Sequence, residues 1–236
     1  MPTSDVLVYT RTAGYRHDSI PAGARALTEL AAELGLAAET TDDPGAFTAE
    51  RLERCAAVVL LSTTGRVLTD PAREALEAYV RAGGGLLAVH AAANAEPDWP
   101  FYGALLGTRF AGHPPLQPGL VHVEDPAHPA TAGLPEPWHW TDEWYDFTAH
   151  PRRPGVHVLL RADESTYEGG THGADHPLAW CHENLGGRFL FTALGHTPES
   201  YATPAFRTHL TGCLHWTTRG RREERHAPPA RDGQQR

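Results

Sequence analysis

The first part of the chain alternates between unbroken apolar runs and stretches of helical periodicity. The apolar runs are Val6–Tyr9, Ala56–Leu61 and Leu86–Val89, and the segments Ile20–Leu34 and Asp70–Val80 between them repeat apolar residues at helical spacing. A strand without polar alternation is buried on both faces, as in parallel sheets that helices cover on each side. The alternation predicts a three-layer α/β fold with a doubly wound, mostly parallel, flavodoxin-like sheet.

One of these runs ends in a histidine. Three glycines precede Leu86–Val89, and His90 follows it together with three alanines. Small residues permit a tight turn after the strand, and such a turn lifts a side chain to the carboxyl edge of the sheet, where open α/β sheets bind ligands. We expect His90 to be functional; a histidine that is hydrogen-bonded within the core is the alternative.

Residues 96–150 break this pattern. They are rich in Pro, Trp, His and Gly, their periodicity is weak, and long loops of this kind are often functional. We interpret them as an inserted loop-rich region that covers the carboxyl edge of the sheet, with a short helix at Phe101–Leu106 and strands at Gly119–Val123 and Trp140–Phe147. A strand at Val156–Leu160 and a hairpin formed by 178–182 and 187–192 follow.

The boundaries of the fold come from the end of the chain. A closing helix is expected at Pro204–Trp216, so residues 1–218 are predicted to form one domain. Beyond it the sequence is rich in Arg, Glu, Pro and Gln without an apolar pattern, and residues 219–236 are predicted to be a disordered tail.

Composition excludes several classes of function. The net charge of −9 argues against a nucleic-acid-binding face. All 20 basic residues are Arg, which excludes a Schiff-base lysine and a Walker-type P-loop, and we expect no nucleotide cofactor. The three cysteines are predicted to be buried free thiols. No signal segment or apolar run long enough for a membrane span is found, so a cytoplasmic location is expected.

Histidine is in surplus, with 15 among 236 residues. Candidates that follow strands or lie in loops are Arg16, His17, His90, His113, Glu143 of the pair Asp142-Glu143, and His196. His90, Glu143 and His196 are the predicted catalytic residues, since a His–carboxylate pair can move protons. Alternatively, His90, His113, Glu143 and His196 bind zinc or a similar divalent metal, which activates water. Each also has a structural interpretation, such as a turn for His113.

No nucleophile stands at the expected turn. His90-Ala91 follows the strand, while Cys55 precedes a strand and therefore lies at the opposite end, so a covalent acyl-enzyme is not expected. Trp144 and Tyr145 lie among polar residues and suit stacking on a sugar ring, although a small core under long loops is the alternative. Arg16, His17, His113, Trp144 and Tyr145 are the predicted substrate-binding set.

An ordered set of segments resembles the trehalose-utilisation (ThuA-like) family across residues 5–218. The segments are Tyr15-Arg16-His17, Gly84–His90, Phe101–Phe110 with His113-Pro114, Val121–Asp125 with His128–Thr131, Asp142–Tyr145, Pro177–Trp180, and Gly187–Thr192 with Gly195-His196. The resemblance implies a class I glutamine-amidotransferase-like fold. It also implies a role in the metabolism of disaccharides and their 3-keto derivatives.

The chain departs from amidotransferases at two points. Those relatives carry a Cys at the strand-to-helix elbow and a His-x-Glu motif after the last strand. Here the elbow holds His90, and the second segment is His196-Thr197-Pro198-Glu199, which argues against glutamine hydrolysis. We therefore expect an enzyme that acts on a 3-keto glycoside or disaccharide. A non-catalytic sugar-binding module and an amidotransferase-type hydrolase with another nucleophile are the alternatives. The aromatic region could also pack against a second copy of the chain, so a homodimer is a further expectation.

Overall fold

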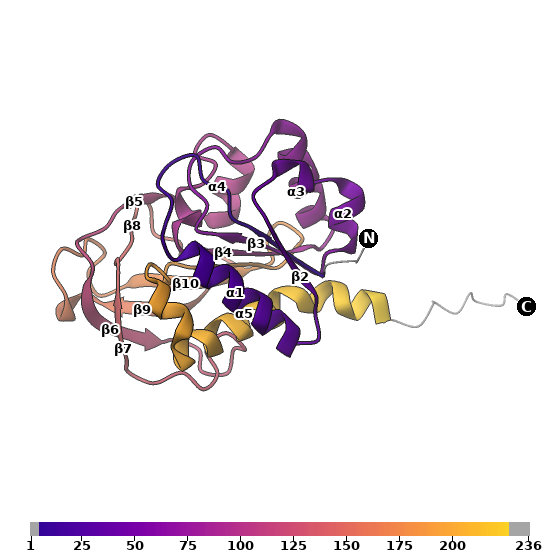
Figure 1. Ribbon diagram of the computed structural model, residues 1–236. Helices are drawn as coiled ribbons and strands as arrows, with labels where there is room; N and C mark the ends of the chain where they lie inside the picture. The colour runs from indigo at the N-terminus through magenta and orange to yellow at the C-terminus, as the bar shows by residue number, and fades with distance from the viewer. Residues whose placement is uncertain (1–4, 227–236) are drawn as a thin grey trace, which may run out of the picture.

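Nine strands form one central sheet in the part of the chain that the computed structural model describes, residues 5–226, with side chains described up to residue 219. Their order is β2-β1-β3-β4-β11-β10-β9-β6-β7 (Figure 1). The strands are β1 (Val6–Tyr9), β2 (Ala38–Thr41), β3 (Ala57–Leu61), β4 (Gly85–Val89), β6 (Gln117–Val123), β7 (Trp138–Asp142), β9 (His157–Asp163), β10 (His176–His182) and β11 (Phe189–Thr192).

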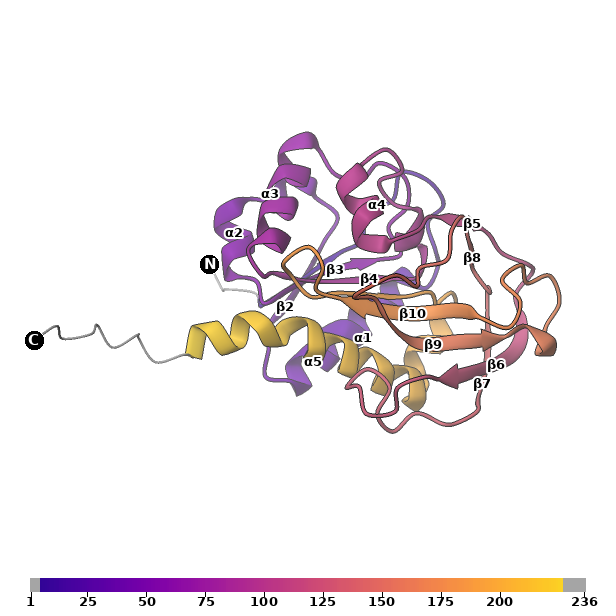
Figure 2. The ribbon, with the colours of Figure 1, turned by 180° about the vertical axis from the view of Figure 1, so that it is seen from behind.

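Helices cover both faces of the parallel half of this sheet. The strands β2, β1, β3, β4 and β11 pair in parallel, and every residue of β3 and β4 is buried. On one face lie α2 (Ala49–Arg54), α3 (Asp70–Arg81) and α4 (Pro100–Leu106), and on the other α1 (Ile20–Glu33) and α5 (Pro204–His226) (Figures 1 and 2). The predicted doubly wound α/β fold is confirmed for this half.

The other half of the sheet is antiparallel. β10 pairs with β11 and β9, and β6 pairs with β9 and β7, so that these strands lie side by side in this half of the sheet (Figure 2). The predicted hairpin of 178–182 and 187–192 is present as β10 and β11. The sheet as a whole is therefore mixed, because strands that follow each other through short connections pair in antiparallel.

The region 96–150 does not simply cover the edge of the sheet. Its strands β6 and β7 extend the main sheet, and β5 (Phe110–Gly112) and β8 (Asp146–Phe147) form a separate antiparallel ribbon. The single strand expected at Trp140–Phe147 is divided, because β7 ends at Asp142 and an irregular turn precedes β8. That turn carries residues 143–145 toward the parallel half.

Short 3₁₀ helices complete the structure: η1 (Pro44–Ala46), η2 (His90–Asn94), η3 (Glu164–Thr166) and η4 (Pro198–Ala202). One glycine of the Gly-rich strand has a packing reason. A Cβ atom on Gly85 would collide with the carbonyl oxygen of Thr217, where α5 crosses the sheet. Only glycine lets this helix approach β4 so closely.

The last helix is longer than the sequence indicates. α5 continues to His226 instead of ending near Trp216, and residues 227–236 of the predicted tail lie outside the described residues. The last part of α5 extends beyond the sheet (Figure 2), where no apolar pattern is needed. Arg and Glu have high helix propensity, so the helix can continue there. The three cysteines are free and buried as predicted. No helix in the described chain is long and apolar enough to cross a membrane.

Candidate active site

His90 occupies a strained turn directly after β4. Its φ is +52°, a region that costs a non-glycine residue about 1–3 kcal/mol, and its side chain is fully buried. The Nδ1 atom lies 2.7 Å from the carbonyl oxygen of Ala193, which can only accept a hydrogen bond. Nδ1 therefore carries a proton, and Nε2 faces the carboxyl edge of the sheet.

Three polar groups surround Nε2 of His90. The hydroxyl of Tyr145 donates to it at 2.9 Å. Nδ1 of His196 lies 3.4 Å away, and the nearer oxygen of Glu143 lies 3.6 Å away. Burial raises the pKa of Tyr145 well above its ordinary value, so this hydroxyl stays neutral and remains a donor.

Glu143 and His196 form an ion pair beside His90. Nδ1 of His196 lies 3.0 Å from the carboxylate of Glu143. Burial alone would raise the pKa of Glu143, but the imidazoles of His196 and His90, 3.0 and 3.6 Å from its carboxylate, outweigh burial and hold the pKa well below its usual range. The hydrogen bond with Glu143 raises the pKa of His196. At neutral pH the site therefore holds an ionised carboxylate.

His17 completes the group from the loop after β1. Its ring lies 4.8 Å from that of His90 and 5.4 Å from that of His196, measured between centroids. Burial, and next the neighbouring His90 and His196, lower the pKa of His17 to about 3, so the ring is neutral. Its Nδ1 atom is buried without a hydrogen-bond partner among the described residues. Such an atom is costly to bury unless a ligand satisfies it.

This group of side chains has the composition of a metal site. One ligand atom from each of His17, His90, Glu143 and His196 lies within 4.8 Å of the others. Three imidazoles and a carboxylate are ligands that zinc and similar divalent ions accept. The neutral His17, the unpartnered Nδ1 and the orientation of His90 by a backbone carbonyl all fit such an ion, since a ligating histidine commonly donates its other N–H to a carbonyl.

His113 lies beside the group but not within it. Its Nε2 atom lies 3.5 Å from Glu143, and its Nδ1 contacts the carbonyl of Pro114. The metal-ligand set expected from the sequence contains His113, whereas the group in the structure contains His17 in its place. The reason is geometric: the loop after β1 lies at the centre of the parallel edge, whereas His113 comes from the ribbon at its side.

A cavity of about 370 Å³ opens against this group. Glu143, Tyr145, His17 and His113 line it, as expected from the sequence. Residues that sequence analysis missed also contribute; they are Tyr15, Thr64, Ala91, Asn94 and Phe110. Tyr15 stands next to the predicted Arg16-His17 pair, and Asn94 ends the short helix that begins at His90, so closeness to those residues was the available signal.

Two predicted substrate-binding residues lie outside this cavity. Arg16 donates to the carbonyl of Thr10 at 2.8 Å and is otherwise exposed. Trp144 is fully buried, stacks on Tyr167 and donates to the carbonyl of Gln117 at 3.1 Å. In the turn between β7 and β8, Trp144 packs into the core, whereas its neighbour Tyr145 lines the cavity. For Trp144 the alternative of a core under long loops describes the structure.

Asp142 is the main residue that sequence analysis passed over. Its fully buried carboxylate accepts four hydrogen bonds. The donors are the backbone amides of Glu143, Gly195 and His196 and the indole of Trp140, at 2.8 to 3.2 Å. One carboxylate thus joins the end of β7 to the loop after β11, and it fixes the backbone of Glu143 and of His196 at the same time.

A second cluster of possible metal ligands contacts the backbone of Tyr145. Ligand atoms of Asp146, His172 and His176 also lie within 4.8 Å of one another. However, Asp146 and His172 each accept a backbone N–H, at 3.1 and 3.0 Å, and Nε2 of His176 donates to the carbonyl of Tyr145 at 2.8 Å. Because these atoms are engaged within the protein, we interpret the cluster as a support for Tyr145.

The fold and this site define an α/β protein with a mostly parallel sheet and a histidine, His90, at the turn after its strand β4. The family model described as ThuA, trehalose utilisation, matches residues 5–217. The chain therefore belongs to the ThuA family. No curated protein matches it.

Solved structures agree with this assignment. A ThuA-like protein from Bacteroides uniformis is 26% identical, with a TM-score of 0.75 over 92% of this chain and 91% of that one. A ThuA-like protein from Parabacteroides merdae is 19% identical, with a TM-score of 0.74 over 93% and 91%. A β-galactosidase from Rahnella sp. R3 is 16% identical, with a TM-score of 0.57 over 92% of this chain and 31% of that one, which indicates a shared fold.

Proposed function

We propose that this protein is an enzyme of carbohydrate metabolism that acts on a 3-keto glycoside or disaccharide at the His17–His90–Glu143–His196 group. The observation that carries the proposal is the meeting of these four side chains, two of which, His17 and Glu143, line a cavity of about 370 Å³. Charged and neutral acid/base groups with shifted pKa values in a cavity are typical of active sites. The trehalose-utilisation family supports a carbohydrate as the substrate class.

The walls of the cavity suit a sugar ring. Tyr145 and Phe110 lie edge to face at 4.6 Å, and His113 stacks near Tyr145 at 5.7 Å, so aromatic surface lies next to the carboxylate of Glu143. Sugar rings combine apolar C–H faces with hydroxyl groups, and such mixed walls can contact both.

The reaction proposed is proton abstraction next to the keto carbon. Glu143 lines the cavity and is ionised, so it is placed to accept that proton. The C–H electron pair then forms a double bond, and the glycosidic oxygen in the β position leaves with its own bonding pair. The proton on Glu143 passes to this oxygen, which balances the step. The hydrogen bond with Glu143 raises the pKa of His196, which favours the protonated imidazole beside the carboxylate. Return of the proton to a neighbouring carbon instead gives isomerisation.

A divalent metal fits the same group. His17, His90, Glu143 and His196 would hold it, and zinc or a similar ion would polarise the carbonyl of the substrate as a Lewis acid. The unpartnered Nδ1 of His17 is the observation that supports this part of the proposal. A cytoplasmic location and a homodimer stay predictions from the sequence.

Turnover of a 3-keto disaccharide, followed by mass spectrometry, tests the proposal. Glu143→Gln is expected to reduce the rate by about 100-fold or more, the range for loss of a positioned acid/base group. His215→Ala, on the exposed side of α5, is the matched control. Metal analysis of the purified protein and of His90→Ala accompanies these measurements.

The outcomes separate the alternatives. Metal-free protein with unchanged turnover in Glu143→Gln and His90→Ala would contradict the proposed site. Tight calorimetric binding of an unmodified sugar without any product would instead favour a non-catalytic binding module. Release of ammonia from glutamine would favour an amidotransferase-type hydrolase.

A further inference from the structure

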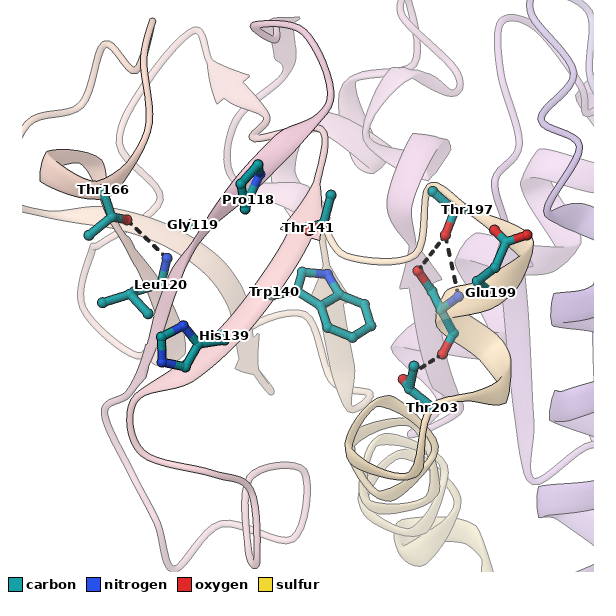
Figure 3. Close-up of a pocket in the computed structure, with 11 residues that line it drawn as sticks. Pro118, Gly119, Leu120, His139, Trp140, Thr141, Thr166, Thr197, Glu199 and Thr203 are labelled. Carbon is teal, nitrogen blue, oxygen red and sulfur yellow. Dashed lines mark hydrogen bonds between the residues drawn. The ribbon is translucent and has the colours of Figure 1, made fainter.

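A second cavity of about 650 Å³ lies between β7 and η4. Figure 3 shows the indole of Trp140 on β7 facing the segment that carries Thr197 and Thr203, while His139 and Leu120 lie on the other side of this strand. None of its lining residues lines the cavity at the His–Glu group. It is therefore a separate groove, which we call the β7–η4 groove.

The polar groups of this groove fall into two kinds. The hydroxyls of Thr166, Thr197 and Thr203 hydrogen-bond to nearby backbone atoms (Figure 3). By contrast, the side chains of His139, Thr141 and Glu199 form no hydrogen bond or ion pair within the described residues. An imidazole and a hydroxyl on the exposed face of β7 and a carboxylate on η4 are thus available to a ligand along the groove.

The charge of the groove limits the class of ligand. No arginine lines it, and the chain has no lysine, so nothing there would neutralise a phosphate or a carboxylate. Glu199 adds a negative charge instead. Pro118, Leu120 and the edge of Trp140 supply apolar surface. Free hydrogen-bonding groups around an apolar and aromatic wall match a neutral sugar ring, which carries hydroxyls and no charge.

The groove also adjoins the active site through the chain. Thr141 precedes Asp142, and Thr197 follows His196. The indole of Trp140 donates to Asp142 at 2.8 Å, and this is the carboxylate that holds the backbone of Glu143 and His196. A ligand against Trp140 thus lies one hydrogen bond from the residue that positions the catalytic pair.

We propose that the β7–η4 groove is a second saccharide site that binds a neutral hexose ring. Its ligand class rests on the proposed function, whereas its geometry is independent of the chemistry at His90. The ring comes either from a free monosaccharide or from one unit of a disaccharide, and the two sources are separated by the choice of probe.

Titration of ¹⁵N-labelled protein with glucose, trehalose and glucose 6-phosphate tests this proposal. The reporter is the indole N–H resonance of Trp140, assigned with Trp140→Phe. We expect neutral sugars to shift it and glucose 6-phosphate to do so only at much higher concentration. A stronger response to trehalose than to glucose would assign the groove to a disaccharide, and the reverse to a monosaccharide.

Variants of the free polar groups complete the test. The double variant His139→Ala/Glu199→Gln is expected to weaken the affinity for neutral sugars about tenfold, as expected for two lost hydrogen bonds. Glu74→Gln, an exposed change on α3, is the control and should leave it unchanged. A Trp140 resonance that no neutral sugar moves, tighter binding of glucose 6-phosphate, or an unchanged affinity in the double variant would overturn the proposal.

The same titration on His90→Ala separates this proposal from the proposed function. Binding that persists in His90→Ala while turnover of the keto sugar is lost supports both. Binding without any turnover in the wild type supports the groove and contradicts the enzyme. Turnover with a silent Trp140 resonance supports the enzyme and contradicts the groove.

Discussion

The imidazole of His90 donates its Nδ1 proton to the carbonyl oxygen of Ala193, 2.7 Å away. This bond joins the ends of two neighbouring parallel strands, β4 and β11. It fixes which nitrogen of His90 faces Tyr145, His196 and Glu143, and so it decides the chemical character of the whole site.

The positive φ of His90 leads to a stability prediction. Glycine adopts this conformation without strain, whereas alanine does not. His90→Gly is therefore expected to have a free energy of unfolding about 1 kcal/mol higher than His90→Ala, although both lack the imidazole. Urea denaturation of the two variants measures the difference. Equal stability would mean that the turn relaxes in the absence of the histidine.

Loss of the Asp142 carboxylate is expected to affect both stability and activity. Asp142→Ala leaves three backbone amides and an indole without their acceptor, which we expect to cost about 1–3 kcal/mol or more in unfolding free energy. Asp142→Asn keeps one acceptor oxygen and should lie between Ala and wild type. Asp98→Asn, at an exposed ion pair, is the control. Thermal denaturation and turnover are measured together; a variant that is stable and fully active would contradict the positioning role.

The Glu143–His196 pair should stabilise the protein within a defined pH window. Glu143 has a lowered pKa, so its contribution is present above the unfolded pKa near 4.3 and is lost as pH falls through the lower folded pKa. His196 has a raised pKa, so its contribution is complete below the unfolded pKa near 6.5 and is lost as pH rises through the higher folded value. The loss of stability in Glu143→Gln should therefore be greatest between about pH 4.3 and 6.5. Denaturation curves across pH measure it, and a loss that grows steadily above pH 7 would argue against the pair.

His17 and His113 should respond differently to metal. A ligand that binds only the folded state raises its melting temperature, so Zn²⁺ is expected to raise that of the wild type and chelation to reverse the rise. His17→Ala should abolish the Zn²⁺-dependent rise, because His17 belongs to the four-residue group, whereas His113→Ala should keep most of it. Differential scanning fluorimetry checks this. Equal loss in both variants would return His113 to the ligand set.

The parallel half of the fold and the core of the site were predictable from the sequence. Unbroken apolar strands such as Ala57–Leu61 can only be buried, and the carboxyl ends of parallel strands share one edge, so His90 and His196 had to approach each other. Glu143 joins them because the turn after β7 enters that edge.

Features that depend on irregular backbone were not predictable. The choice between His17 and His113 depends on how two loops fold, and neither loop has a periodicity that sets the direction of its side chains. Trp144 and Tyr145 are both aromatic and both buried, yet Trp144 stacks on Tyr167 in the core and only Tyr145 lines the cavity. Of the pair Asp142-Glu143, only Glu143 was a candidate from the sequence. A carboxylate that accepts hydrogen bonds from three backbone amides and one indole has no sequence signature, so the role of Asp142 could not be predicted.

The position of β11 has a consequence for synthesis on the ribosome. β11 lies in the interior of the sheet, next to β4, although its residues are made about a hundred positions later. Until Phe189–Thr192 leaves the ribosome, β4 presents an unpaired apolar edge, which is the kind of edge that promotes aggregation. A nascent chain that stalls before β11 therefore exposes the centre of its own sheet, and it also lacks Ala193 and His196, so neither stability nor function can precede the completion of this last strand.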